Sequence, residues 1–127
     1  QSQFSAPLQA PPPRTPVLRA AVERGRALPA LDHSADALGA AVGVSPRHLA
    51  RLFAAELQIS PAKFVERTRL DHAKSLLDAG HGVAETARAA GFGSTETLRR
   101  TFVAQFDVSP SQYRARFAST GTEDRPR

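Results

Sequence analysis

Hydrophobic residues between positions 16 and 118 recur every three or four positions, a spacing typical of amphipathic helices. Around position 50, for example, Leu49, Leu52, Phe53 and Leu57 follow an i, i+3, i+4, i+8 stripe, and Arg and Ala fill the positions between them. The region is rich in Ala, Leu, Arg and Glu and poor in alternating β-branched runs, which favours helices over strands. We therefore expect an all-α fold.

Serine and glycine residues indicate where the helices begin and end. Serine precedes proline at positions 45, 60 and 109. A serine at the N-cap accepts a hydrogen bond from a backbone N–H that has no partner within the helix. A proline at the first helical position has no N–H group that would need a partner. Ser34 and Ser94 are further N-cap candidates, and Ser109 with Gln112 fits a capping box. Glycines at 43, 80 and 91 fit helix ends. These signals predict seven helices, at about residues 16–28, 35–42, 46–57, 61–79, 83–90, 95–106 and 110–118.

The chain also contains an internal duplication. When Gly43 is aligned with Gly91 and one extra residue is allowed after Phe92, residues 45–67 match residues 94–116 at eight of 23 positions. Each copy has a short helix, a turn with glycine and a longer helix, which is the helix-turn-helix pattern. We predict a first helix-turn-helix at about 35–57, a linker helix at about 61–79 and a second helix-turn-helix at about 83–106.

The second helix of each copy has one face that is free of large apolar residues. These outward faces carry Arg47, Ala50, Arg51 and Ala54 in the first copy, and Glu96, Arg99, Arg100 and Val103 in the second. In a helix-turn-helix protein this helix enters the major groove of DNA. Arg donates two hydrogen bonds to guanine, and an Ala methyl suits the methyl group of thymine. Ser45 and Ser94, at the helix starts, are placed to hold a phosphate, and His48 lies beside the first outward face.

The length of the predicted linker helix suits a domain that binds two major grooves of DNA. Nineteen residues at 1.5 Å each give about 28 Å, against about 34 Å for one turn of DNA. Its apolar stripe of Phe64, Leu70, Ala73 and Leu77 is expected to dock onto both subdomains. We predict that this rigid helix sets the two recognition helices into successive major grooves.

These features together resemble the DNA-binding domain of AraC/XylS-type bacterial transcription regulators, over residues 16–118. The resemblance rests on Gly43–Phe53, on Arg69-Leu70, Ala73 and Leu76-Leu77, and on a C-terminal signature that includes Gly91-Phe92, Leu98–Phe102 and Val108–Arg114. It implies seven helices, two helix-turn-helix units and binding to asymmetric DNA as a monomeric domain. By position, the residues it implies as base contacts are Arg47, Ala50 and Arg51, followed by Thr95, Glu96, Thr97 and Arg100.

Three positions depart from the family pattern or leave alternatives open. Thr86 stands where an aliphatic residue is usual and Gly39 where alanine is usual, and we expect both to loosen the packing slightly. Glu96 is either an acceptor for cytosine N4 or the partner of Arg100 in an i,i+4 pair on the same helix.

Composition narrows the function further. The 127-residue chain has a net charge of +5, and 15 of its 17 cationic residues are Arg, the residue suited to phosphate and guanine. It has no cysteine, and its four histidines are not spaced as metal ligands. No phosphate-binding loop or catalytic serine elbow occurs. We therefore expect no enzyme activity, no cofactor, no metal and no membrane association.

The expected function is that of a cytoplasmic, sequence-specific DNA-binding domain of a bacterial transcription regulator. Its expected partners are double-stranded DNA and RNA polymerase. A non-specific nucleic-acid binder and a helical protein-interaction module remain the alternatives. Because the chain begins with Gln1, we expect it to be a piece of a longer protein, with residues 1–15 as an interdomain linker and 119–127 as a disordered tail. Residues 1–7 resemble the junction after an amidase-like sensor domain, and any dimer is expected to form through that missing domain.

Overall fold

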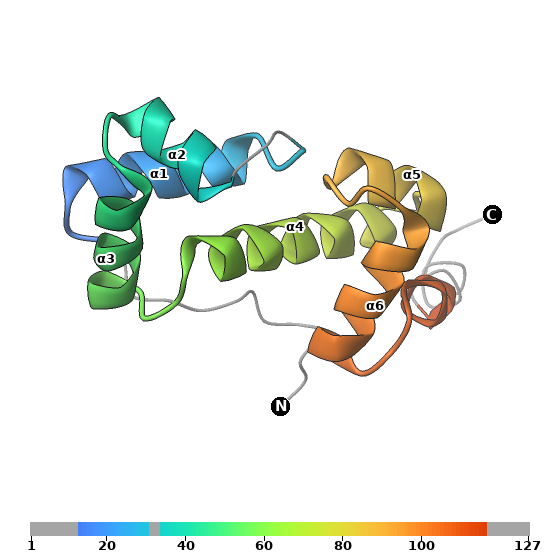
Figure 1. Ribbon diagram of the computed structural model, residues 1–127. Coiled ribbons are helices and arrows are strands. Elements are labelled where there is room, and N and C mark those ends of the chain that lie inside the picture. Colours follow the sequence, from blue (N-terminus) through green and yellow to red (C-terminus); the bar gives the residue numbers. More distant parts are fainter. Residues whose placement is uncertain (1–12, 31–33, 117–127) are drawn as a thin grey trace. The chain divides into compact units, whose positions relative to one another are not determined.

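The computed structural model describes residues 13–30 and 34–116, and this part of the chain contains helices and no strand (Figure 1). The helices are α1 (Pro16–Ala27), α2 (Ala35–Val42), α3 (Pro46–Glu56), α4 (Pro61–Asp78), α5 (Val83–Ala89) and α6 (Thr95–Phe106). A seventh helical segment, residues 110–116, reaches the last described residue. The all-α prediction is confirmed, and α1, α3, α4 and α5 each end one residue earlier than predicted. The predicted tail and nearly all of the predicted linker lie outside the described residues.

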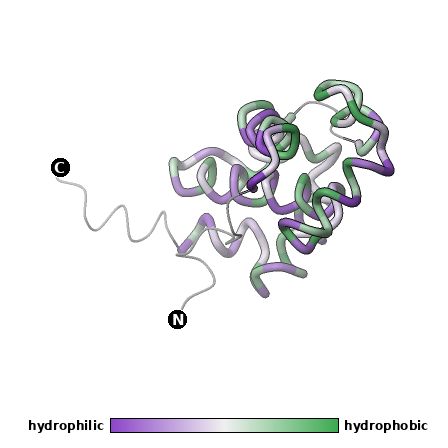
Figure 2. The backbone as a smooth tube through the Cα atoms, turned by 90° about the vertical axis from the view of Figure 1, so that its left-hand side faces the viewer, coloured by the Kyte–Doolittle hydropathy of each residue, from purple (hydrophilic) through white to green (hydrophobic). Residues whose placement is uncertain are grey.

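The described residues form two compact units, which meet in sequence within α4. We call residues 13–69 the first unit and residues 70–116 the second unit. Each unit has its own hydrophobic core, and the alternation of hydrophobic and hydrophilic positions along the helices is visible in Figure 2. The predicted apolar stripe of α4 is buried, with Phe64 in the first core and Leu70, Ala73 and Leu77 in the second. One helix therefore contributes to both cores.

Buried side chains from α1, α2, α3 and the start of α4 make up the first core. Phe53 of α3 packs against Phe64 of α4 with 5.3 Å between ring centroids. A Cβ at Gly25 of α1 would come within 2.7 Å of the Phe64 ring. Glycine at this position therefore lets α1 pack directly against that ring.

The second core repeats this arrangement. Phe102 of α6 packs against Tyr113 with 5.6 Å between ring centroids, as its counterpart Phe53 packs against Phe64. The Tyr113 hydroxyl also donates a hydrogen bond of 2.6 Å to Asp78 Oδ1, at the end of α4. Burial and this hydrogen bond to a carboxylate raise the pKa of Tyr113. The duplication seen in the sequence is thus also a duplication of packing.

The turn of the first helix-turn-helix corrects the expectation for Gly39. Gly43 has a φ of 82° and closes the turn in the left-handed region, so that the Val44 N–H donates to the Gly39 carbonyl at 2.9 Å. A Cβ at Gly39 would lie only 2.6 Å from the Val44 carbonyl oxygen. Gly39 does not loosen the packing; it permits a backbone approach that alanine would obstruct.

The second turn carries an extra residue, Gly93, and has alanine at the position of Gly39. The Phe92 N–H donates to the Ala87 carbonyl at 2.9 Å, the counterpart of the bond in the first turn. Thr86, beside it, is fully buried, and its hydroxyl has no hydrogen-bond partner within the described part of the chain. The departure at Thr86 therefore places an unsatisfied polar atom in the second core.

Candidate nucleic-acid interface

Serine caps fix the first turn of each recognition helix. The Ser45 Oγ accepts a hydrogen bond of 3.1 Å from the His48 N–H at the start of α3, and the Ser94 Oγ accepts one of 3.1 Å from the Thr97 N–H at the start of α6. The other predicted caps, Ser34, Ser60 and Ser109, make the same type of bond, and Gln112 completes the capping box with Ser109. All five predicted serine caps are confirmed.

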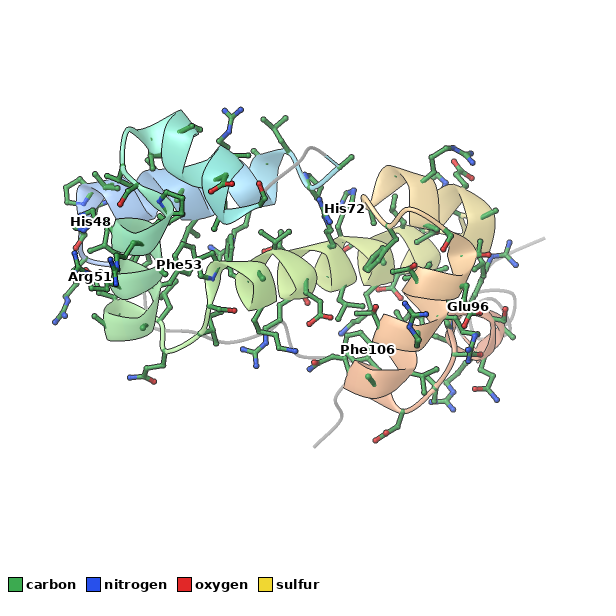
Figure 3. The ribbon with its side chains drawn as sticks, in the orientation of Figure 1. His48, Arg51, Phe53, His72, Glu96 and Phe106 are labelled. Atoms are coloured by element: carbon green, nitrogen blue, oxygen red, sulfur yellow. The ribbon has the colours of Figure 1, made fainter. Side chains whose placement is uncertain are left out.

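The outward face of α3 is exposed and carries two unpaired cations. Arg47, His48, Ala50 and Arg51 are all exposed, whereas Phe53 on the same helix is fully buried. Figure 3 shows His48 and Arg51 on the outer side of α3, with Phe53 on the side that faces the core. Among the described residues, neither Arg47 nor Arg51 has a hydrogen-bond or ion-pair partner. Both guanidinium groups are therefore available to a ligand.

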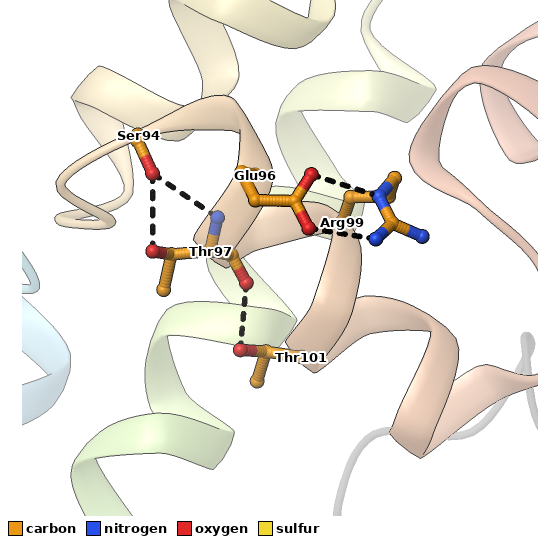
Figure 4. A network of polar contacts seen from close by, with 5 residues as sticks. All are labelled: Ser94, Glu96, Thr97, Arg99 and Thr101. Carbon is orange, nitrogen blue, oxygen red and sulfur yellow. Dashed lines mark hydrogen bonds and ion pairs between the residues drawn. The ribbon is translucent and has the colours of Figure 1, made fainter.

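The outward face of α6 is also exposed, but one of its arginines is engaged. Thr95, Glu96, Arg99 and Arg100 are exposed. Glu96 Oε1 accepts a hydrogen bond of 3.1 Å from Arg99 Nε, and Glu96 Oε2 accepts one of 2.7 Å from the terminal Nη2 of Arg99 (Figure 4). Arg99 lowers the pKa of the Glu96 carboxyl through these hydrogen bonds and its charge, and the charge of Arg100 contributes less. Glu96 in turn raises the pKa of Arg99 through the same hydrogen bonds and its own charge.

This geometry bears on the two alternatives left open for Glu96, an acceptor for cytosine or the partner of Arg100. Glu96 pairs on its own helix, but with Arg99, three residues further along, whose Nε and Nη2 meet both carboxylate oxygens. Arg100 makes no hydrogen bond or ion pair with the other residues that the structure describes. It matches Arg51 in the duplication, so each recognition helix presents an unpaired arginine at the same position.

Thr97 has mainly a local role in this arrangement. It is half-buried, and its Oγ1 lies 3.0 Å from the Ser94 Oγ. Its carbonyl accepts a hydrogen bond of 2.7 Å from the Thr101 hydroxyl (Figure 4). Ser94 and Thr97 thus organise the start of α6, and a base contact by Thr97 stays a prediction.

A shallow hollow of about 600 Å³ lies beside the outward face of α3. Its lining is mostly apolar and consists of Ala50, Ala54, Gln58, Ile59 and Ser60. Reasoning from the sequence identified the two alanines but missed the last three residues. No sequence signal pointed to this hollow. Gln58 and its counterpart in the duplication, Asp107, both take positive φ angles, of 62° and 65°, just after a recognition helix.

The end of α3 is anchored by a contact that no sequence pattern indicated. Glu56 Oε1 accepts hydrogen bonds from the backbone N–H groups of Arg14, at 2.6 Å, and Thr15, at 3.0 Å. The Thr15 hydroxyl donates to the second carboxylate oxygen. These bonds lower the pKa of Glu56, the Thr15 hydroxyl most of all. The carboxylate thereby fastens the start of α1 to the end of the first recognition helix.

The predicted site residues thus form two exposed faces, one on each recognition helix. Ser45, Arg47, His48, Ala50 and Arg51 lie on or beside α3 in the first unit, and the remaining six lie on or beside α6 in the second. No group of three or more potential metal ligands occurs among the described residues. Within the same residues, no helix is long and apolar enough to cross a membrane.

Comparisons with known proteins agree with this architecture. Residues 38–116 match the model of a helix-turn-helix domain family. The chain is 41% identical over 96 residues to the HTH-type transcriptional regulator Rv1931c of Mycobacterium tuberculosis, an alignment that covers 75% of this chain and 36% of that protein. It is 38% identical over 82 residues to the uncharacterized HTH-type transcriptional regulator YijO of Escherichia coli, covering 63% of this chain and 29% of that protein. The chain thus spans about a third of the length of these relatives.

Two solved structures share the fold along most of the chain. One is a transcriptional regulator of Chromobacterium violaceum described as an AraC-type DNA-binding domain-containing protein, with a TM-score of 0.75, 33% identity and coverage of 84% of this chain and 96% of that one. The other is the DNA-binding domain of the global transcriptional factor AdpA in complex with a target DNA, with a TM-score of 0.79, 25% identity and coverage of 86% and 99%. From the family match, the relatives and the two helix-turn-helix units, we conclude that the chain belongs to the AraC-type helix-turn-helix family, the DNA-binding domains of transcriptional regulators.

Proposed function

We propose that this chain binds double-stranded DNA sequence-specifically, as part of a bacterial transcription regulator, by placing α3 and α6 in successive major grooves. The observation that carries the proposal is the pair Arg51 and Arg100. The two occupy equivalent positions on duplicated recognition helices, are exposed, and have no hydrogen-bond or ion-pair partner among the described residues. An unpaired guanidinium on such a helix suits the O6 and N7 atoms of guanine.

The residues around these two arginines support readout of bases as well as phosphates. Arg47 and His48 lie at the start of α3, where contacts to bases and to the phosphate backbone are made in helix-turn-helix proteins. Ala50 lines the shallow apolar hollow, which suits the methyl group of a thymine. On α6, Thr95 adds a hydroxyl group to the exposed face. A surface built only for non-specific binding would instead carry cations throughout.

The length of α4 is compatible with engagement of two grooves by one chain. Its 18 residues extend about 27 Å at 1.5 Å per residue, somewhat less than the 34 Å of one helical turn of DNA. The AdpA domain, to which 86% of this chain is similar, was solved with a target DNA.

We further propose that RNA polymerase is a partner of the protein, that the protein acts in the cytoplasm, and that any dimer contact lies outside this chain.

Selection of bound duplexes from a random pool, followed by gel-shift titration, tests the proposal. We expect an enriched sequence that binds about a thousandfold or more tightly than random DNA at moderate salt. A ratio near one would support non-specific binding instead. No binding even at low salt would favour a protein-interaction module.

Substitution of Arg51 or Arg100 shows which base pair of the selected site each arginine contacts. Arg51→Ala or Arg100→Ala should cost about 1–3 kcal/mol of binding free energy and relax the preference at one base pair. Arg19→Ala, which removes an exposed cation of α1, serves as the matched control and should leave base preference unchanged. A duplex with deoxyuridine in place of a preferred thymine tests for the methyl contact beside Ala50.

A further inference from the structure

The outward faces of the two recognition helices differ in charge at two pairs of equivalent positions. The duplication aligns Arg47 with Glu96 and Ala50 with Arg99, whereas arginine is retained at the next position, 51 and 100. The face of α3 therefore has two cations and no acid, and the face of α6 has two cations and one acid. The acid lies one helical turn before the arginine that has no counterpart in the first copy.

On α6, Glu96 holds this additional arginine in a two-point contact. Arg99 uses Nε and Nη2 to reach the two carboxylate oxygens, at 3.1 and 2.7 Å. Both side chains are more than half exposed, at 53% for Arg99 and 59% for Glu96. Because the pair lies on the surface, it is not required to fill the core. It determines which guanidinium groups of the outward face are free.

The contact between Glu96 and Arg99 affects how α6 binds a DNA duplex. A guanidinium binds phosphate most strongly through two parallel N–H donors, and Glu96 already occupies such a pair on Arg99. The carboxylate also repels nearby phosphate groups. Arg100, which follows directly, has no such partner among the described residues. On the outward face of α6, Arg100 therefore has no donor engaged by an acid, whereas Nε and Nη2 of Arg99 are engaged by Glu96.

We propose that Glu96 is a specificity-determining residue that acts through Arg99: by holding Nε and Nη2 it limits the binding of the Arg99 guanidinium to the phosphates of a non-cognate duplex, and it leaves Arg100 to read a base. The inference rests on the proposed function, since it assigns a role within the same DNA-binding face. Non-specific affinity depends on the number of cations that reach phosphates. On the selected site the base contacts fix where the outward face of α6 lies, whereas on random DNA its cations bind whichever phosphates they reach. Restraining Arg99 therefore lowers the affinity for random DNA more than the affinity for the cognate sequence, and the difference between the two increases.

Glu96→Ala tests this role through the salt dependence of binding. Release of Arg99 to one additional phosphate should steepen the slope of log K against log salt concentration on a random duplex by about 0.9. At low salt the affinity for the random duplex should rise about three- to tenfold, and the specificity ratio should fall by a similar factor. An unchanged slope and an unchanged specificity ratio would overturn the inference.

Two further variants separate an effect through Arg99 from a direct contact. In an Arg99→Ala background, Glu96→Ala should change the salt slope and the affinity for random DNA much less, because no Arg99 guanidinium is left to release. If Glu96 instead accepts from cytosine, its substitution will relax one base pair, and the change will persist in that background; this result would overturn the inference. Glu66→Ala is the matched control, because Glu66 forms an exposed i,i+3 pair with Lys63 on α4 and is not part of a recognition helix; it should leave the slope unchanged.

The same titrations distinguish failure of this inference from failure of the proposed function. If the unmodified chain does not prefer its selected site over random DNA, the proposed function fails. If it does, and Glu96→Ala changes neither slope nor ratio, only the role of Glu96 fails. Circular dichroism of each variant establishes that the helices are retained.

Discussion

Individual residues determine how closely the helices of each helix-turn-helix approach one another. Position 39 has no room for a Cβ, because the Cβ would clash with the Val44 carbonyl oxygen. The second copy accommodates the Cβ of Ala87 at the equivalent position, and its turn contains one more residue, Gly93. The sequence has a small residue at both positions, which suits the close crossing of two helices. It does not reveal that position 39 requires glycine, because that depends on the path of the backbone at Val44, five residues away.

Gly39→Ala should therefore destabilise the domain, although alanine is normally the better helix former. Overpacking against backbone typically costs 1–3 kcal/mol, and the gain in helix propensity returns up to about 1 kcal/mol, so we expect a net loss of about 1–2 kcal/mol. Urea unfolding at neutral pH measures the difference. Gly93→Ala, where a Cβ meets open space, is the control and should change stability by less than about 0.5 kcal/mol. Equal effects of the two substitutions would contradict this interpretation of the turn.

Thr86→Val should have the opposite effect and stabilise the second unit. The buried hydroxyl has no partner within the described residues, so its replacement by a methyl group removes a desolvated polar atom, a gain of about 1 kcal/mol. Thr101→Val is the comparison, because the Thr101 hydroxyl donates to the Thr97 carbonyl and its loss should give no gain. A lower melting temperature for Thr86→Val would show that the hydroxyl is satisfied in solution.

At the scale of helices, local signals were sufficient for most of the fold. Serine caps, turn glycines and the spacing of apolar residues predicted both ends of α1 to α6, and the start of the seventh helical segment, to within one residue, because a cap and its partner lie only three residues apart. The contact between Glu56 and Thr15 was not predictable in this way, because it joins residues 41 positions apart. An ion pair on the same helix was one of the two alternatives left open for Glu96, and the structure forms it with Arg99 instead of Arg100; i,i+3 and i,i+4 neighbours both lie within reach on a helix.

The contact at the end of α3 should make stability depend on acidity. Because hydrogen bonds lower the pKa of Glu56 in the folded chain, its contribution is complete well above the ordinary glutamate value of about 4.3 and is lost as the pH falls through the folded value. Urea unfolding of the unmodified chain and of Glu56→Gln should therefore differ at pH 7, and the difference should shrink as the pH falls below about 4.3. A difference that is the same at pH 7 and pH 3 would exclude this role for the carboxylate.

At the scale of the whole molecule, one duplicated unit accounts for both cores and for both outward faces. Phe53 and its equivalent Phe102 lie in the cores and hold each unit together. Arg51 and its equivalent Arg100 lie on the outward faces and are free to bind. The sequence predicted this division because apolar and charged residues lie on opposite sides of the same helices. It could not predict which outward arginine is held by an acid, since that depends on side-chain geometry.

The most direct test of the central claim is guanine methylation interference on the selected duplex, with the unmodified chain, Arg51→Ala and Arg100→Ala. We predict two groups of sensitive guanines about one helical turn, or 10 base pairs, apart. Arg51→Ala should remove the sensitivity in one group, and Arg100→Ala should remove it in the other. A single group of sensitive guanines, or loss of the same guanine in both variants, would contradict the claim that both recognition helices read the duplex.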